Sequence, residues 1–204
     1  GEFFGGLADY LEIDRRYVVM VPGNHDINRT ACQTARLMAV EKGEPFNIPY
    51  FPKFELYKEF FDDFYKDATF PEGVVPYRFT EDSLFVNFLF PKEKVAFLGL
   101  NSCIDESELD PHYGNITVDQ LKRATDELKT EDPNGRFFRV AMMHHNFVRS
   151  SDNDNENLKD ADDLKPLLQN SNIRLILHGH QHFPRDEVTG KGDRLIHVLA
   201  TGSA

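Results

Sequence analysis

Short apolar runs alternate with amphipathic segments along most of the chain. Runs rich in β-branched or aromatic residues predict buried strands at 17–21, 77–80, 84–90, 95–100, 137–143, 173–177 and 194–199. Helical spacing and capping signals predict helices near 7–11, 30–42, 53–66, 117–129 and 160–169. Strands that lead into helices this regularly predict an α/β domain whose sheet layers are covered by helices.

The segment 53–66 carries the clearest helical pattern. Its aromatic residues repeat every three or four positions and are Phe54, Tyr57, Phe60, Phe61, Phe64 and Tyr65. We expect this stripe to pack into the core and not to stack on nucleic acid bases. The segment lies within residues 27–77, which are longer than a simple connector. We expect them to form a helical insert or cap on a single domain that spans residues 1–204.

The composition excludes several classes of protein. A net charge of −11 argues against a broad cationic surface that binds nucleic acid through its phosphates. No apolar run approaches the roughly 18 residues that a membrane helix needs, so no membrane partner is expected. The only cysteines, Cys32 and Cys103, are isolated from each other. They fit a reducing compartment without a disulfide framework, and we expect a cytoplasmic protein.

Three polar segments each follow a predicted strand. Gly-Asn-His-Asp occupies positions 23–26, His-His-Asn positions 144–146, and Gly-His-Gln-His positions 179–182. The carboxyl ends of strands in an open α/β sheet are the usual place for a functional site. We therefore expect these three segments to meet at one edge of the sheet.

The side chains in these segments suit metal binding and acid-base chemistry. His180 and His182 are two residues apart, so on an extended backbone both point to one side, and neutral imidazole binds Zn, Fe or Mn. Asn24 offers an uncharged oxygen ligand. His25 can protonate a leaving oxygen, and Asp26 can orient its ring. The plainer alternative is an ordinary turn with solvated His25 and Asp26, beside a histidine pair that binds nothing.

The ordered set of segments resembles the last three motif blocks of the calcineurin-like metallophosphoesterase family. Residues 95–102, a strand ending in a polar pair, and 116–121, a helix start, resemble the family's intervening stretches. The resemblance covers about residues 17–203. It implies a two-sheet α/β sandwich flanked by helices and a site for two divalent or trivalent metal ions, such as Mn, Fe or Zn.

Carried over by position, the resemblance implies that Asn24, His144 and His180 bind the second metal and that His182 binds the first. It implies that His25 is the catalytic histidine, near the scissile phosphate. The family pattern is usually His-x-Pro with the first histidine as the ligand, which favours His144 as the ligand.

Four histidines remain besides the three ligand histidines and His25. Asn146 stands where the family commonly has proline, so His145 stays open as the alternative ligand to His144. His178 directly precedes the Gly-His-Gln-His segment, and we expect a structural role for it. His112 and His197 lie outside the motif segments, and we expect structural roles for both.

The chain departs from the family pattern upstream of residue 23. The family's first two blocks, Asp-x-His and Gly-Asp, have no counterpart there, because Asp9 and Asp14 lack the required neighbours. We therefore expect a domain that is incomplete at its N-terminus, without its first strands, and part of a longer chain.

Three functions compete on this evidence. The first is hydrolysis of phosphoesters, with phosphodiesters favoured and a nucleotide among the candidate substrates. The second is a catalytically degenerate phosphoesterase fold that serves as a scaffold. The third is a mononuclear zinc hydrolase that uses His144, His180 and His182.

Overall fold

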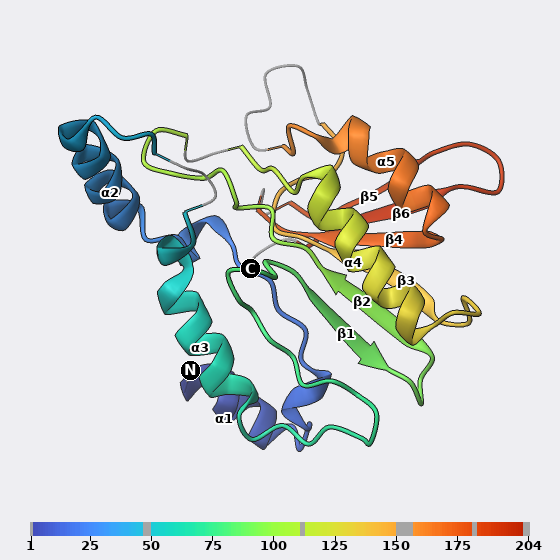
Figure 1. Cartoon of the computed structure of the whole chain (residues 1–204). Coiled ribbons are helices and arrows are strands. Elements are labelled where there is room, and N and C mark those ends of the chain that lie inside the picture. Colours follow the sequence, from blue (N-terminus) through green and yellow to red (C-terminus); the bar gives the residue numbers. More distant parts are fainter. Residues whose placement is uncertain (1, 47–49, 111–112, 150–156, 181–182, 202–204) are drawn as a thin grey trace.

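The computed structural model describes residues 2–46, 50–110, 113–149, 157–180 and 183–201. Its strands form one sheet with the spatial order β1-β2-β3-β4-β6-β5 (Figure 1). They are β1 (Val86–Phe90), β2 (Val95–Gly99), β3 (Phe138–Met142), β4 (Ile173–His178), β5 (Arg185–Thr189) and β6 (Ile196–Ala200). The helices are α1 (Glu2–Tyr10), α2 (Arg29–Lys42), α3 (Glu55–Tyr65), α4 (Val118–Glu131) and α5 (Ala161–Asn170), with 3-10 turns η1 (Arg15–Tyr17), η2 (Asn24–Asp26) and η3 (Phe51–Phe54).

The middle of the sheet is parallel. β2, β3, β4 and β6 run in the same direction, and β1 and β5 join as antiparallel edge strands. The α/β class with flanking helices is confirmed. The expected second sheet does not occur among the described residues, where all six named strands share one sheet. The parallel strands bring their carboxyl ends to one edge, where ligands bind in folds of this class.

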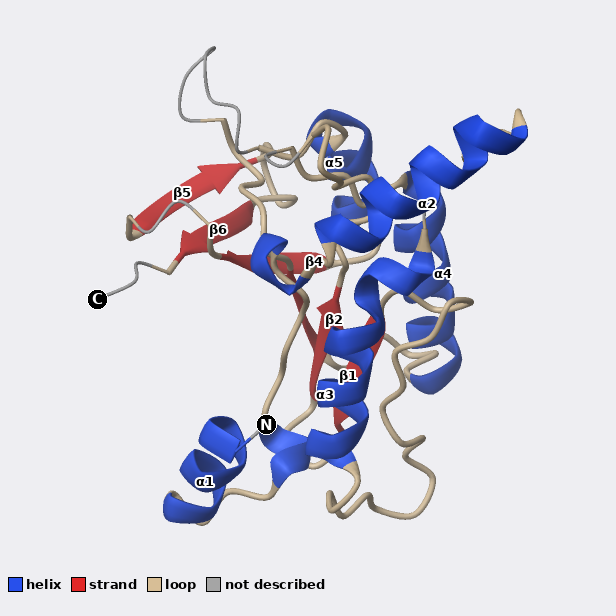
Figure 2. Cartoon of the chain, turned by 90° about the vertical axis from the view of Figure 1, so that its left-hand side faces the viewer, coloured by secondary structure: helices blue, strands red, loops and turns tan. Residues whose placement is uncertain are grey.

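Side chains alternate across the sheet and contribute to two hydrophobic cores. Leu89 of β1 and Leu98 of β2 pack with residues of α4 and α5 on one face. Phe88 and Phe97, one position away on the same strands, pack with residues of α3 on the other face. Figure 2 shows α3 lying in front of β1 and β2. The sheet therefore separates an aliphatic core from an aromatic one.

The aromatic stripe of segment 53–66 lies in the core, as predicted. Tyr57, Phe61, Phe64 and Tyr65 are each at most 5% exposed. Tyr65 Oη also donates a hydrogen bond of 2.6 Å to the Val18 carbonyl. The helix thus secures the chain segment that leads to the candidate site.

Two of the predicted strands are wrong. Residues 18–21 are extended but join no strand of the described sheet, and residues 77–80 form only a bridge between Thr80 and Ser83. Side chains hold these segments instead. Tyr77 Oη donates to the Arg16 carbonyl, and Val21 lies against Gly99 of β2. The apolar runs therefore correctly indicated that these segments contribute to the hydrophobic core. They did not indicate whether a neighbouring strand is available for pairing.

The edge strand β5 was not predicted. Its sequence, Arg-Asp-Glu-Val-Thr, is mostly charged, and it carries no buried side chain. Antiparallel pairing with β6, from Arg185 opposite Ala200 to Thr189 opposite Ile196, sets its position. Backbone pairing with β6 therefore defines this strand. Its sequence has no pattern of buried residues from which the strand could have been predicted.

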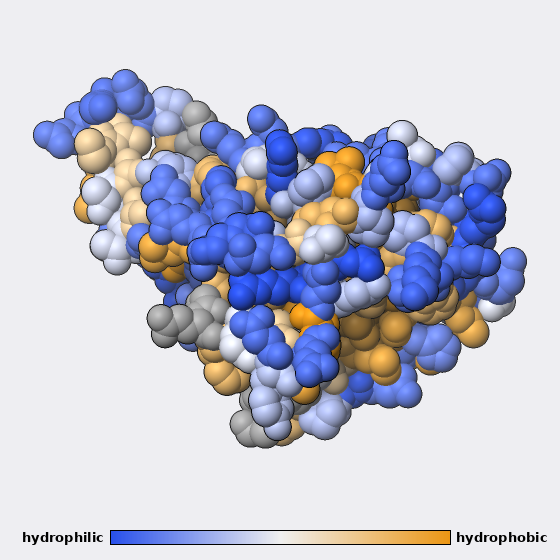
Figure 3. All heavy atoms as spheres, turned by 90° about the horizontal axis from the view of Figure 1, so that it is seen from below, coloured by the Kyte–Doolittle hydropathy of each residue, from blue (hydrophilic) through white to orange (hydrophobic). Residues whose placement is uncertain are grey.

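The face shown in Figure 3 is mostly hydrophilic, with smaller hydrophobic patches between the hydrophilic residues. Exposed apolar side chains occur on α1 and on α2, which extends away from the sheet (Figure 1). They include Phe3, Tyr10, Leu37, Met38 and Val40. Among the described residues, none of the helices has the length and apolar character needed to span a bilayer.

A buried ion pair joins the end of α4 to β3. Asp132 and Arg139 are 3% and 5% exposed, and Arg139 Nη2 lies 3.0 Å from Asp132 Oδ2. The Asp132 carboxylate also accepts hydrogen bonds from the backbone N–H groups of Arg136 and Phe137. Burial alone would raise the pKa of Asp132, but these hydrogen bonds and the Arg139 charge hold it below its usual value.

We expect Asp132→Asn to lower the free energy of unfolding at neutral pH by about 1.5–3 kcal/mol, the range for hydrogen bonds to a charged group. Because the pKa of Asp132 is lower in the folded state, its contribution is present above the unfolded value, near pH 3.9, and is lost as the pH falls through the folded value. In urea unfolding between pH 7 and pH 3, the free energy of unfolding should fall less steeply with decreasing pH in the variant than in the parent protein.

Asp126→Asn on α4 is the matched control for this prediction, because the Asp126 side chain is 68% exposed. It should change the unfolding free energy little. An equal pH profile for Asp132→Asn and the parent protein would refute the assigned role of Asp132.

Candidate metal centre

Two of the three predicted segments follow neighbouring parallel strands. His144 comes just after β3 and His180 just after β4, and the Gly179 N–H donates to the His144 carbonyl at 3.1 Å. The third segment, Gly23–Asp26, contains η2 and lies against His144 from outside the sheet. The structure therefore brings the three segments together at the carboxyl edge.

Three of the four predicted ligands meet here. His144 Nε2 lies 3.1 Å from Asn24 Oδ1 and 2.9 Å from His180 Nδ1. Ligand bonds of about 2.0–2.2 Å in a tetrahedron imply ligand-to-ligand distances of roughly 3.3–3.6 Å. Each of these two pairs would open by roughly 0.2–0.7 Å to share a cation. This donor set fits a borderline divalent metal.

The backbone makes this approach possible at two positions. His180 has φ of 73°, a left-handed conformation that few residues other than glycine adopt and that often marks functional sites. A Cβ atom at Gly23 would lie 3.0 Å from His144 Nδ1. Glycine at position 23 therefore lets the Asn24 segment approach the His144 ring closely.

His182, the fourth predicted ligand, lies outside the described residues, as do Gln181 and His112. Its role as a ligand of the first metal stays a prediction. The same holds for most of the acidic segment after Asn146, of which 150–156 are not described.

His25 and Asp26 lie at the rim of the site, and both are exposed. Asp26 Oδ2 accepts a hydrogen bond of 2.8 Å from the Gly23 N–H, so its carboxylate holds the turn that carries Asn24. Its predicted role in orienting His25 stays a prediction. His25 opens onto a cavity of about 530 Å³, whose lining is His25, Asp26, Ile27, Asn28, Arg29, Thr30, Leu56, Tyr57 and Phe60.

His145, the alternative ligand, is fully buried beside the other rings. Its ring centroid lies 5.0 Å from that of His144 and 4.7 Å from that of His180. Ser102 Oγ lies 2.9 Å from His145 Nδ1 and accepts hydrogen bonds from the backbone N–H groups of His144 and His145. Burial, with a smaller effect of the two neighbouring rings, lowers the pKa of His145 to about 2. The ring is therefore neutral at working pH.

Sequence reasoning missed one group of potential metal ligands. Cys103, Glu106 and His145 place one ligand atom each within 4.8 Å of the others. The signal was present as Cys-x-x-Glu just after the strand at 95–100, but its third member comes from another strand end. Only the pairing of β2 with β3 brings the three together.

Asp9 and Asp14 serve local structure at the N-terminus. Asp14 Oδ1 accepts a hydrogen bond from the Arg16 N–H and caps η1, and Asp9 pairs with Arg15 at 3.8 Å. His178 is 7% exposed, and burial lowers the pKa of its ring.

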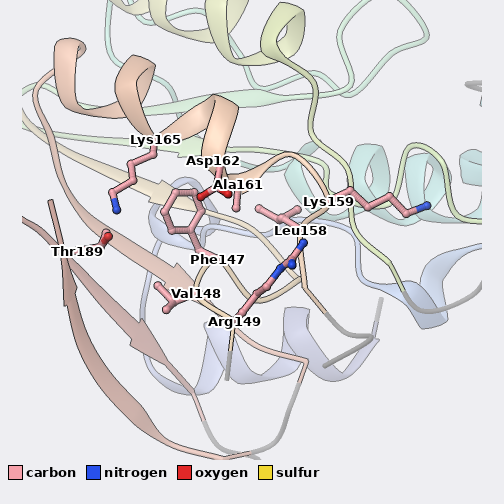
Figure 4. A pocket seen from close by; sticks show the side chains of 9 residues that line it. All are labelled: Phe147, Val148, Arg149, Leu158, Lys159, Ala161, Asp162, Lys165 and Thr189. Atoms are coloured by element: carbon pink, nitrogen blue, oxygen red, sulfur yellow. The ribbon is translucent and has the colours of Figure 1, made fainter. Parts of the chain in front are cut away.

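A separate pocket of about 260 Å³ lies beside α5 (Figure 4). Phe147 and Lys165 line it, and Lys165 points toward Thr189 of β5. None of the predicted site residues lines this pocket. The candidate chemistry therefore belongs to the sheet edge and not to this pocket.

Comparison with known proteins gives two matches. The sequence model of the calcineurin-like phosphoesterase family matches residues 2–184. A protein of Bacillus subtilis (strain 168), described as the uncharacterized metallophosphoesterase-like protein YydB, is 27% identical over 194 residues. The match covers 89% of this chain and 36% of that protein, so the chain spans about a third of the length of this relative.

Proposed function

We propose, from the premise that this chain belongs to the calcineurin-like phosphoesterase family, that it hydrolyses phosphodiesters at a two-metal site. The family in general carries out metal-dependent phosphoester hydrolysis. The observation that carries the proposal is the meeting of Asn24, His144 and His180 at the carboxyl edge of the sheet. We assign Asn24, His144 and His180 to one metal and His182 to the other.

The proposed metal ions would activate the water and neutralise phosphate charge, which the side chains of this site cannot do alone. When bound, two divalent cations acidify a water and offset negative charge on the phosphoryl oxygens. The protein residues then have separate tasks. Asn24 provides a neutral ligand that does not repel an anionic substrate. His25, at the rim, donates a proton to the leaving oxygen.

The cavity beside His25 supports a diester substrate. Leu56, Tyr57 and Phe60 of α3 form an apolar wall, and Arg29 of α2 brings a positive charge to the same cavity. An anionic phosphate that bears two organic groups matches this combination, because one group can pack on the wall while the charge lies near Arg29. Residues 27–77 would then act as the insert that shapes the substrate site.

The test is His25→Ala in the full-length protein. We expect it to retain its metals and to lose about 10²–10⁴-fold in turnover, the range for a general acid. A diester with a nitrophenyl leaving group needs little protonation, so the loss should be much smaller with that substrate than with an alkyl diester.

Two results would contradict the role of His25. Loss of bound metal would make it a ligand, and equal losses on both substrates would remove the proton-donor role. Metal analysis of the same preparations also tests the alternative functions. The metal lost when His144, His180 and His182 are replaced by alanine counts the ions at this edge. Two equivalents support the proposal, one equivalent supports the mononuclear hydrolase, and none supports a scaffold.

A further inference from the structure

A second group of potential metal ligands lies next to the candidate centre, in the buried interior. Cys103 follows β2, Glu106 lies three residues further on, and His145 follows β3. They are 0%, 1% and 0% exposed, and one ligand atom of each lies within 4.8 Å of the others. Ionisable groups are rarely concentrated in this way out of contact with water, because buried charges are normally paired or bind metals.

Two potential ligand atoms in this group, Glu106 Oε2 and His145 Nε2, accept no hydrogen bond from a described N–H or O–H group. Glu106 Oε1 accepts from Arg29 Nη2 at 3.0 Å, whereas Oε2 is buried and has no N–H or O–H partner among the described residues. His145 Nδ1 contacts Ser102, whereas Nε2 is buried and without a hydrogen-bond partner in the described part of the chain. Cys103 Sγ lies 3.6 Å from the Pro22 carbonyl, and its thiol also interacts with Glu106. Native proteins rarely leave buried polar atoms unpaired.

We propose that Cys103, Glu106 and His145 bind one zinc-like divalent ion, at a site separate from that of Asn24, His144 and His180. Thiolate, imidazole and carboxylate are the three ligand types that zinc uses in proteins. The thiolate and the carboxylate bring two negative charges to the ion, and Arg29 adds one positive charge at the outer oxygen of Glu106. The Cys103 proton is released to solvent when the metal binds.

Neighbouring residues already orient two of these ligands. Arg29 holds one oxygen of Glu106, and Ser102 holds the Nδ1 side of His145. Partners of this kind fix ligand orientation at metal sites. Ligand atoms around tetrahedral zinc lie roughly 3.3–3.7 Å apart, so a pair at the present limit of 4.8 Å would close by about 1.1–1.5 Å when the ion binds. Three protein ligands leave a fourth position for water.

The test is the visible and ultraviolet spectrum of the full-length protein loaded with Co²⁺ alone. A thiolate ligand gives a sulfur-to-cobalt charge-transfer band that nitrogen and oxygen ligands do not give. We expect this band in the parent protein. We expect Cys103→Ser to abolish it, and Glu106→Gln to weaken it and to lower the affinity for Co²⁺ by at least 10-fold.

Two matched variants test whether the band comes from this site. Cys32→Ser removes the other buried free cysteine and should leave the band unchanged. His180→Ala disrupts the proposed catalytic centre and should also leave the band unchanged. The band therefore tests the Cys103 site separately from the proposed function.

No band in the folded parent protein would overturn the proposal without recourse to any variant. A band that survives in Cys103→Ser would assign the thiolate to another residue. Circular dichroism identifies a variant that has unfolded. If Cys103→Ser unfolds, the Co²⁺ titration of Glu106→Gln tests the site instead. An unchanged Co²⁺ affinity in that variant would refute the site.

Discussion

His144→Ala is expected to remove metal from the carboxyl edge of the sheet and to lower phosphodiester turnover by more than about 10⁴-fold, beyond the contribution of a general acid. His144 Nε2 is the atom that contacts both Asn24 Oδ1 and His180 Nδ1. Its loss therefore takes away the central ligand and not a peripheral one. Turnover and bound metal, measured on the same preparation, check this result.

His197→Ala is the matched control, because His197 is an exposed histidine on β6 of the same sheet. It should keep the full metal content and turnover. If His144→Ala also keeps both, His144 is not a ligand, and His145 becomes the candidate. Unchanged circular dichroism would show that a loss in His144→Ala comes from the site and not from unfolding.

Phe61→Ala is expected to lower the free energy of unfolding by about 3–5 kcal/mol, the range for deletion of a buried phenyl ring. Phe61 is 0% exposed, and its ring centroid lies 4.6 Å from Tyr65 and 6.0 Å from Tyr57. It also lies 6.3 Å from Phe79, which comes from the segment before β1. The substitution therefore leaves a cavity where α3 meets the segment before β1. Urea unfolding followed by circular dichroism measures the effect.

Leu56→Ala on the same helix is the control, because Leu56 is 64% exposed. It should change stability by less than about 0.5 kcal/mol. Equal effects of the two substitutions would mean that the aromatic core contributes little to folding. A Phe61→Ala loss below about 1 kcal/mol would lead to the same conclusion.

Much of the fold was accessible from sequence because burial leaves a periodic pattern. Apolar runs at residues 84–90 and 95–100 identified β1 and β2, and aromatic spacing identified α3. Residues 18–21 have the composition of a strand, but a strand also requires a neighbour. Only tertiary structure reveals whether one is present.

The candidate site was predictable to a different extent for each residue. His144 and His180 follow predicted strands that turn out to be parallel neighbours, so their convergence follows from topology. Asn24 reaches them from a segment that joins no strand of the described sheet, and only the motif indicated its place. The Cys103 and Glu106 pair was missed because its partner, His145, is some 40 positions away in sequence.

The charged composition of β5 has a consequence for self-association. An open edge strand presents unpaired backbone groups to which a strand of another molecule can add. Asp186 is exposed at this edge, and Arg185 and Glu187 are half-buried there. A second copy that approached edge to edge would have to desolvate these charges. We therefore infer that β5 protects the protein against fibre-like aggregation on that side.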